Sequence, residues 1–177
     1  RQAHHERVRL LLFLSGNGIT NKRTMTLFKL IHLLAVLIWV GGMFFAHLVL
    51  RPAAVEALQP PERLRLWNAV LRRFFNWVWA AICVILVTGF YLIYQYGGIA
   101  HVARHVHIML VSGLVMMVIF VYVFFACYVP LSLHVAKQRW KEAEERLGKI
   151  RILVALNLAL GLLTLFVATI GAALRVI

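Results

Sequence analysis

The chain has 177 residues, of which 63% are hydrophobic and 14% are charged, and its mean hydropathy is +0.85. This composition excludes an ordinary soluble domain of the same length and indicates an integral membrane protein. The net charge of +13 raises nucleic acid as a partner, but the basic residues gather in the connections between apolar segments, as membrane topology requires. We therefore expect a lipid bilayer, whose anionic surface attracts such charge, as the partner, and no nucleic acid.

Four apolar segments are long enough to cross a bilayer as helices, which takes about 20 residues. They are Leu27–Leu50, Phe74–Tyr96, Val106–Leu131 and Ile152–Leu174. Their continuous apolar character excludes the alternating pattern of a membrane β-barrel. The predicted fold class is therefore all-α, an integral membrane four-helix bundle with up-down topology. One transmembrane domain covers residues 25–177, and residues 1–24 form an N-terminal extension of unknown role.

The distribution of basic residues predicts the orientation of the bundle. The connections after the first and third segments hold most of them: Arg51, Arg63, Arg65, Arg72, Arg73, Lys137, Arg139, Lys141, Arg146, Lys149 and Arg151. The short connection between the second and third segments has only Arg104, and the C-terminus only Arg175. The positive-inside rule places the two basic connections in the cytoplasm and both termini on the outer side of a bacterial inner membrane.

Proline and glycine predict local features of the helices. Pro130 is expected to kink or end the third membrane helix, because proline removes a backbone donor. The segment after it, LSLHVAKQRWKEAEERLGKIR, contains helix formers and the i,i+4 pair Lys141 and Glu145, so we expect a helix that continues into the cytoplasm with its charges on a solvated face. Small residues in the spans are expected to allow close helix approach: Gly41, Gly42, Gly89, Gly113, Gly161 and Gly171.

Histidines are concentrated at one end of the predicted bundle. His32 lies one turn inside the first segment, His107 lies at the start of the third, and His101 and His105 flank that start. The first and third helices of an up-down bundle run in the same direction, so His32 and His107 are expected at the same depth near the outer face. Ionisable groups within a membrane are functional candidates, and we interpret these histidines as ligands rather than as isolated hydrogen-bonding residues.

Imidazoles on facing helices are typical axial ligands of haem b. We expect one haem b between His32 and His107, with Lys29 and Arg104 facing its propionates. His105 is the alternative second ligand, because it points about 200° round the helix from His107 and takes its place if the helix begins later.

His47 lies about 22 Å below His32 by helix rise, near the opposite face. Tyr122 occupies the same depth on the third helix, so we expect a hydrogen bond between the two, or a proton path through His47. A second haem lacks a matching ligand at that depth, unless His134 reaches past Pro130.

Three motifs carry a resemblance to a known family: HLLAVLIWVGGMFF in the first helix, RRFFNWVWAAICVILVTGFYL in the second and HVHIMLVSGLVM at the start of the third. The chain from Met25 onward resembles the membrane family that includes HemJ-type protoporphyrinogen oxidases and the CopD domain of copper-resistance proteins. The resemblance implies a haem ligand at His32. HemJ-type proteins open their third helix with His-x-Lys, where this chain has His105-Val106-His107, so the resemblance implies haem b more than that particular reaction.

Two main functions remain open. The first is a haem b protein that transfers electrons or oxidises a quinol or porphyrinogen near the outer face, with a redox partner or a larger respiratory complex. The second is copper transport or copper resistance, with histidines for Cu(II) and thioethers for Cu(I). The candidate copper ligands are His32, His101, His105, His107, Met43, Met109, Met116 and Met117. A small structural subunit of a respiratory complex is a third candidate, and no catalytic residue is assigned.

Overall fold

The computed structural model describes the backbone of residues 2–173 and the side chains of residues 22–171 and 173. Within these residues the chain is all-helical, and four stretches are long and apolar enough to cross a membrane: Lys22–Ala57, Pro60–Gln95, Arg104–Ala136 and Trp140–Gly171. Large apolar side chains such as Leu37, Val87 and Val118 are more than 60% exposed, as a lipid environment requires. The predicted all-α membrane bundle is confirmed.

The chain forms two helical hairpins. The first consists of α1 (Gln2–Phe45), the π-helical segment η1 (Ala46–Leu50), α2 (Arg51–Ala57) and α3 (Pro60–Gln95). The second consists of α4 (Arg104–Tyr122), the π-helical segment η3 (Val123–Tyr128), α5 (Val129–Ala136) and α6 (Trp140–Ala173). The short 3-10 turn η2 (Ile99–His101) lies in the connection between the hairpins. The backbone of residues 2–24 continues the first helix, whereas the side chains of residues 1–21 lie outside the described part.

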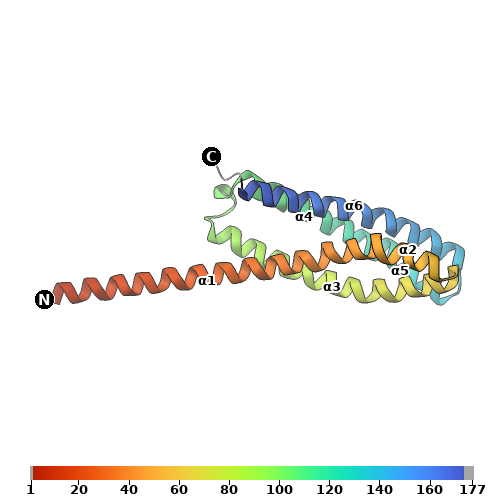
Figure 1. The fold of residues 1–177 in the computed structure, drawn as a ribbon, viewed down its shortest axis with the longest axis horizontal. Helices are drawn as coiled ribbons and strands as arrows, with labels where there is room; N and C mark the ends of the chain where they lie inside the picture. The colour runs from red at the N-terminus through yellow and green to blue at the C-terminus, as the bar shows by residue number, and fades with distance from the viewer. Residues whose placement is uncertain (1, 174–177) are drawn as a thin grey trace.

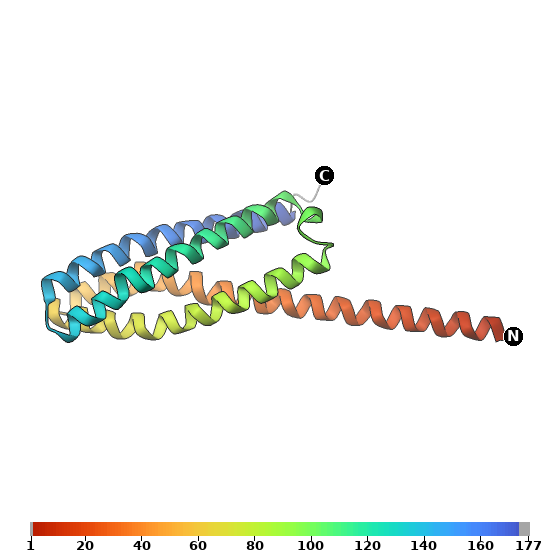
Figure 2. The same ribbon diagram turned by 180° about the vertical axis from the view of Figure 1, so that it is seen from behind.

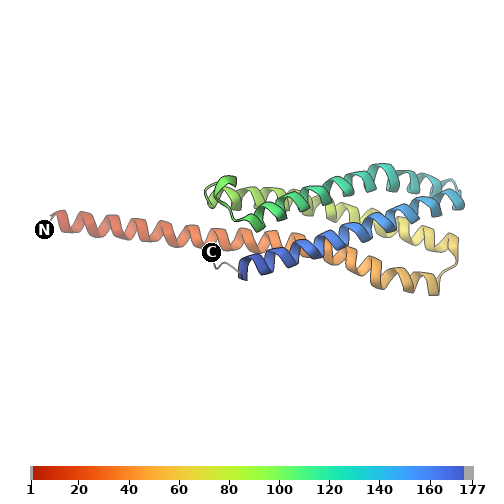
Figure 3. The ribbon, with the colours of Figure 1, turned by 90° about the horizontal axis from the view of Figure 1, so that it is seen from above.

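Helices α1 and α3 run side by side, as do α4 and α6 (Figures 1 and 2). Residues 58–59 and 137–139 turn the chain at one end, called here the basic end, and residues 96–103 connect the hairpins at the other, called here the histidine end. The two hairpins pack against each other near the basic end and diverge toward the histidine end, beyond which α1 projects alone (Figure 1). Seen from above, α6 crosses α1 near the middle of the bundle (Figure 3).

Aromatic rings from α3, α4 and η3 fill the core between the hairpins. Phe75 is 2% exposed, and its ring centroid lies 5.3 Å from that of Phe120 and 5.1 Å from that of Tyr128, both in edge-to-face contacts. Such contacts stabilise a core beyond the area that they bury. The core therefore holds the two hairpins together on the basic-end side of the diverging region.

Close packing at several glycines agrees with the sequence prediction. A Cβ atom at Gly42 would collide with the Phe74 ring of α3, and one at Gly161 would meet Val40 and Met116. Gly89 and Gly171 each lie against a histidine, as described below. A Cβ atom at Gly113 would meet nothing within 4 Å, so the prediction of close helix approach is wrong there. Because glycine has no side chain, Gly113 instead leaves space in the cavity described in the next subsection.

Pro130 does not end its helix. The π-helical segment η3 runs into α5, which contains Pro130 and continues to Ala136. A proline at this position cannot donate to the carbonyl of Ala126, four residues earlier. Arg146 of α6 supplies the donor, with its Nη1 atom 3.4 Å from the Ala126 oxygen. The first hairpin has the same order of features, with η1 directly before Pro52. Each hairpin thus combines a π-helical segment with a proline near its basic end.

The helix expected to run without a break from residue 131 into the cytoplasm is not formed. The chain turns after Ala136, Gln138 has a positive φ of 56°, and α6 begins at Trp140. This reversal lays the charged first turns of α6 against α3 instead of exposing all their charges to solvent. The solvated-face interpretation is therefore wrong for Arg151, whose side chain is only 20% exposed.

Candidate functional site

A cavity of about 440 Å³ lies between the two hairpins in the half of the bundle toward the histidine end. Residues of α1, α3, α4 and α6 all line it, and nearly all of them are apolar. Its volume falls within the range of about 300–1000 Å³ typical of sites for small molecules and cofactors. Two histidines and three methionines supply most of the side chains on its wall that can bind a metal: His32, His105, Met109, Met116 and Met117.

His32 is held by a hydrogen bond to Thr88 of α3. The Thr88 hydroxyl is buried and donates its single hydrogen to the Val84 carbonyl, with 2.5 Å between the oxygens. It therefore accepts from His32, whose Nδ1 atom lies 2.8 Å away. This arrangement assigns the proton of the neutral ring to Nδ1 and leaves the lone pair on Nε2. An imidazole oriented in this way is prepared to bind a metal through Nε2.

Gly89, the residue after Thr88, gives the His32 ring its place. A Cβ atom at Gly89 would lie 3.3 Å from Cε1 of the ring, closer than ordinary packing allows. Consecutive residues of α3 therefore orient the imidazole and make room for it.

His105 lies in the first turn of α4 and packs directly on α6. A Cβ atom at Gly171 would lie 2.5 Å from Cβ and 2.6 Å from Cγ of His105, so only glycine fits beneath the ring. Each hairpin thus presents one histidine from its first long helix, seated on a glycine of its second long helix. Both rings belong to the wall of the same cavity.

Lys29 and Tyr96 lie at the end of the cavity nearest the histidine end. The Lys29 Nζ atom is 5.4 Å from the centroid of the Tyr96 ring, a distance at which a cation is attracted to an aromatic face. The contact places a positive charge beside the predominantly apolar wall. Lys29 thus lies in the cavity wall, and its expected role beside haem propionates stays a prediction.

His107, the second ligand expected from the sequence, does not lie in the wall of this cavity. It is exposed, and its Nδ1 atom lies 3.3 Å from the Ala103 carbonyl. Arg104 is likewise exposed and absent from the wall. Helix α4 begins at Arg104, and with that helical phase His105 faces the cavity while His107 points about 200° away.

His101 and His47 also lie away from the cavity. The Nδ1–H group of His101 donates to the Gly97 carbonyl at 2.9 Å, within the connection between the hairpins. His47 lies in η1, and among the described residues no hydrogen bond joins it to Tyr122, whose side chain is 56% exposed. The prediction of a hydrogen bond between them is therefore wrong.

The methionines divide in the same way. Met43 is 2% exposed and packs in the core, whereas the three methionines of α4 line the cavity. Within the described residues, no three side chains of His, Cys, Asp or Glu gather into a metal site. A metal bound near His32 and His105 would therefore draw a further ligand from the thioether of Met109, one turn along α4 from His105. Imidazole and thioether form a soft, neutral donor set that suits Cu(I).

Sequence reasoning missed Thr88, Tyr96 and the close contact between Gly171 and the His105 ring. The pair Thr88-Gly89 within the second-helix motif was the available signal, because a hydroxyl followed by a glycine in an apolar helix favours close contact with a polar group on a neighbour.

One comparison with protein families gives a match. The family model described as copper resistance protein D matches residues 68–171, more than half of the chain. The matched part includes Thr88, Gly89, His105, the methionines of the cavity wall and Gly171. Neither the curated proteins nor the solved structures include a match. The CopD side of the sequence resemblance is thereby confirmed, and no comparison supports the HemJ-type specificity. This membrane chain belongs to the copper resistance protein D family.

Proposed function

We propose that the protein binds copper within the bilayer, in the cavity between its two hairpins, as part of copper transport or resistance. The observation that carries this proposal is that His32, His105 and three methionine thioethers line one cavity. The family match supports the same chemistry. Neutral ligands leave Cu(I) as a single positive charge, which is less costly in an apolar environment than Cu(II) would be.

Each ligand group has a separate role in this proposal. His32 offers Nε2, because Thr88 holds its Nδ1 proton. His105 brings a second imidazole from the other hairpin. The thioether of Met109, one turn along α4 from His105, supplies a soft donor to the same ion. Met116 and Met117 line a deeper part of the cavity, about 16 Å or more from His105 by helix rise, beyond the reach of an ion that His105 binds. A copper ion bound by both imidazoles would link the two hairpins where they diverge.

The test is a competition titration of the purified full-length protein with a chromophoric Cu(I) chelator. We expect one high-affinity site, weakened by His32→Ala, by His105→Ala and by a triple Met→Leu variant at positions 109, 116 and 117. His107→Ala is the matched control and should bind as the wild type does, because this histidine lies outside the cavity. Equal losses in the His105 and His107 variants would contradict the proposal.

A second candidate is haem b in the same cavity, and the cavity volume favours it. About 440 Å³ is far more than a single ion fills and falls in the range of organic cofactors. His32 and His105 would hold the iron from opposite hairpins, and Lys29 would stand beside a propionate. When bound, the group would supply one-electron chemistry for a hydrophobic donor of the quinol or porphyrinogen class.

One pair of measurements separates the candidates. Reduced-minus-oxidised optical spectra of the purified protein would show sharp b-type bands if haem is bound, and the triple Met→Leu variant would leave them unchanged. In the copper case the spectra lack these bands and the same variant loses Cu(I). A protein that binds neither would be a structural subunit, and both proposals would fail.

A further inference from the structure

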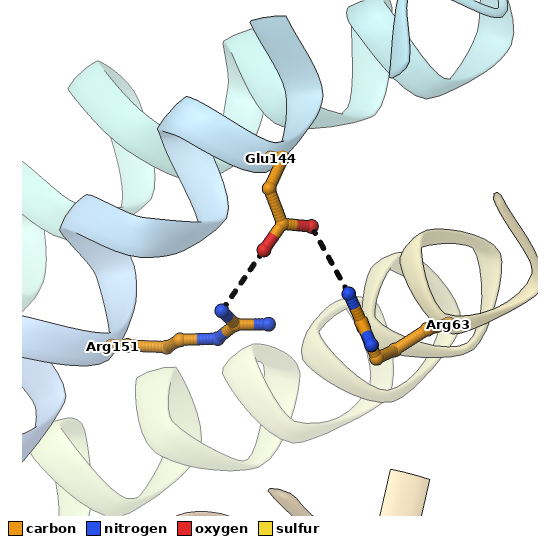
Figure 4. A network of polar contacts seen from close by, with 3 residues as sticks. All are labelled: Arg63, Glu144 and Arg151. Carbon is orange, nitrogen blue, oxygen red and sulfur yellow. Dashed lines mark hydrogen bonds and ion pairs between the residues drawn. The ribbon is translucent and has the colours of Figure 1, made fainter. Parts of the chain in front are cut away.

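A second polar cluster lies at the basic end, away from the cavity. Arg63 of α3 and Arg151 of α6 both face the carboxylate of Glu144 on α6 (Figure 4). Arg151 Nη1 lies 3.0 Å from Glu144 Oε1 and forms a hydrogen bond, whereas Arg63 Nη2 lies 3.9 Å from Oε2. The arginine side chains are only 16% and 20% exposed. The Glu144 side chain is 40% exposed, so the cluster is an interhelical set of charges in which the two guanidiniums are largely buried and the carboxylate is partly exposed.

The charges of this cluster do not balance. Two guanidinium groups share one carboxylate, which leaves one positive charge uncompensated in a partly desolvated site. Uncompensated charge of this kind is costly unless an anion approaches it. The other acidic residues of this part of α6, Glu142 and Glu145, are exposed, and neither forms an ion pair within the described residues.

The hydrogen-bond donors are also in excess. Arg63 Nε and Arg151 Nε and Nη2 are buried and have no partner. Trp67, one turn beyond Arg63 on α3 and 5% exposed, has an unpartnered Nε1 as well. The other unpartnered buried atoms here are the acceptors Glu144 Oε2 and Asn68 Oδ1, and neither forms a hydrogen bond with these donors. Buried polar groups are normally satisfied, so this surplus points to an additional acceptor.

We infer that Arg63 and Arg151 form a binding site for a phosphate-type oxyanion, either the phosphodiester of an anionic lipid headgroup or free phosphate. Guanidinium groups offer paired N–H donors that match phosphate oxygens in geometry and charge. Basic pockets between transmembrane helices are a recurrent type of headgroup site. Glu144 neutralises one of the two guanidinium charges across the α3–α6 contact, and the anion neutralises the other. This site is independent of copper or haem in the cavity.

The test uses the full-length protein in nanodiscs. One arm measures retention of phosphatidylglycerol by native mass spectrometry against neutral lipid, and the other titrates inorganic phosphate into protein held in neutral lipid alone. We expect saturable binding in at least one arm, and the arm that shows it identifies the source. Arg63→Gln and Arg151→Gln should each weaken that binding at least about tenfold, the effect of losing a hydrogen bond to a charged group. Arg73→Gln, at an exposed arginine of α3, is the charge-matched control and should have little effect.

Glu144→Gln distinguishes a binding site from a structural ion pair. It removes the negative charge that repels an anion, so it should strengthen phosphate or headgroup binding while weakening the α3–α6 contact. Thermal unfolding of each variant establishes that it is folded. The inference is overturned if Arg73→Gln weakens binding as much as Arg151→Gln does, if Glu144→Gln fails to strengthen binding, or if folded wild-type protein binds in neither arm.

Discussion

Replacing Thr88 by Val removes one hydroxyl while keeping the shape of the side chain. In the wild type this hydroxyl accepts the Nδ1–H of His32 at 2.8 Å and is 4% exposed, so water does not readily replace it. The Nδ1–H group would lose its acceptor, at a cost of about 1–3 kcal/mol for a buried polar group. At 1.4 kcal/mol per factor of ten, this corresponds to a loss of about 5-fold to 150-fold in affinity.

Part of this free-energy cost weakens metal binding. Without the Thr88 hydroxyl, the His32 ring can rotate or change tautomer to find another hydrogen-bond partner, and its Nε2 lone pair is then less available to a metal. Removal of such an outer partner typically costs about 10-fold to 100-fold in metal affinity. We therefore expect Thr88→Val to weaken Cu(I) binding about tenfold or more and Thr88→Ser to bind nearly as the wild type does. Chelator competition measures the affinity, and ¹⁵N NMR of labelled histidine reports the tautomer.

Thr169→Val is the matched control. Thr169 lies on α6, is exposed, and its hydroxyl donates only to the Leu165 carbonyl at 2.8 Å. The control thus removes the same kind of hydroxyl and the same helix-backbone hydrogen bond, without touching a histidine. If Thr88→Val and Thr169→Val bind Cu(I) equally well, or if His32 shows a proton on Nε2 in the wild type, the argument from the hydrogen-bond chain is refuted.

Three further predictions concern the cavity and the topology. Gly171→Val should displace the His105 ring and weaken Cu(I) binding at least about tenfold, because the contact that orients this ligand is lost. Gly113→Ala is the control and should be tolerated, because a Cβ atom there meets nothing within 4 Å. Chelator competition measures both affinities, and equal values would count against His105 as a ligand. His47→Ala should leave Cu(I) binding unchanged, because His47 does not line the cavity. Loss of binding in a folded variant would show that a metal-binding residue lies near the basic end and would contradict the proposed site. A reporter active only in the cytoplasm should give signal when fused at Glu142 and none after Ile177, and the reverse pattern would invert the proposed orientation.

The four membrane helices could be predicted from the sequence because the signal is local. A window of about 20 apolar residues identifies a span whatever the rest of the chain does. His32 was identified for the same reason, as a polar residue within such a window. The turn at residues 137–139, which separates α5 from α6, was missed because the charged segment reads as helix throughout and the turn contains no glycine or proline that would signal it.

The second histidine of the cavity could not be assigned from the sequence, because the assignment depends on helical phase. His105 and His107 are two residues apart, and the choice between them follows from the point where α4 begins and from its contact with Gly171. In a soluble protein the polar face of a helix would reveal this phase. In a membrane helix the lipid-facing side is apolar too, so periodicity carries little information.

Contacts between distant segments account for the remaining differences. Thr88 meets His32 from another helix, and Arg63 meets Glu144 across α3 and α6. Neither pair has a sequence signature, because side chains of ordinary type acquire their roles only when the hairpins pack. Arg146 of α6 likewise reaches the Ala126 carbonyl in η3 only because the two helices pack together.

The central claim, that His32, His105 and the Met109 thioether bind one copper ion, is tested most directly by X-ray absorption at the copper edge on the Cu(I)-loaded protein. Both nitrogen and sulfur neighbours are expected around the metal. His105→Ala should remove a nitrogen neighbour, and His107→Ala should leave the spectrum unchanged. A copper environment without sulfur, or one that responds to His107→Ala and not to His105→Ala, would contradict the assignment.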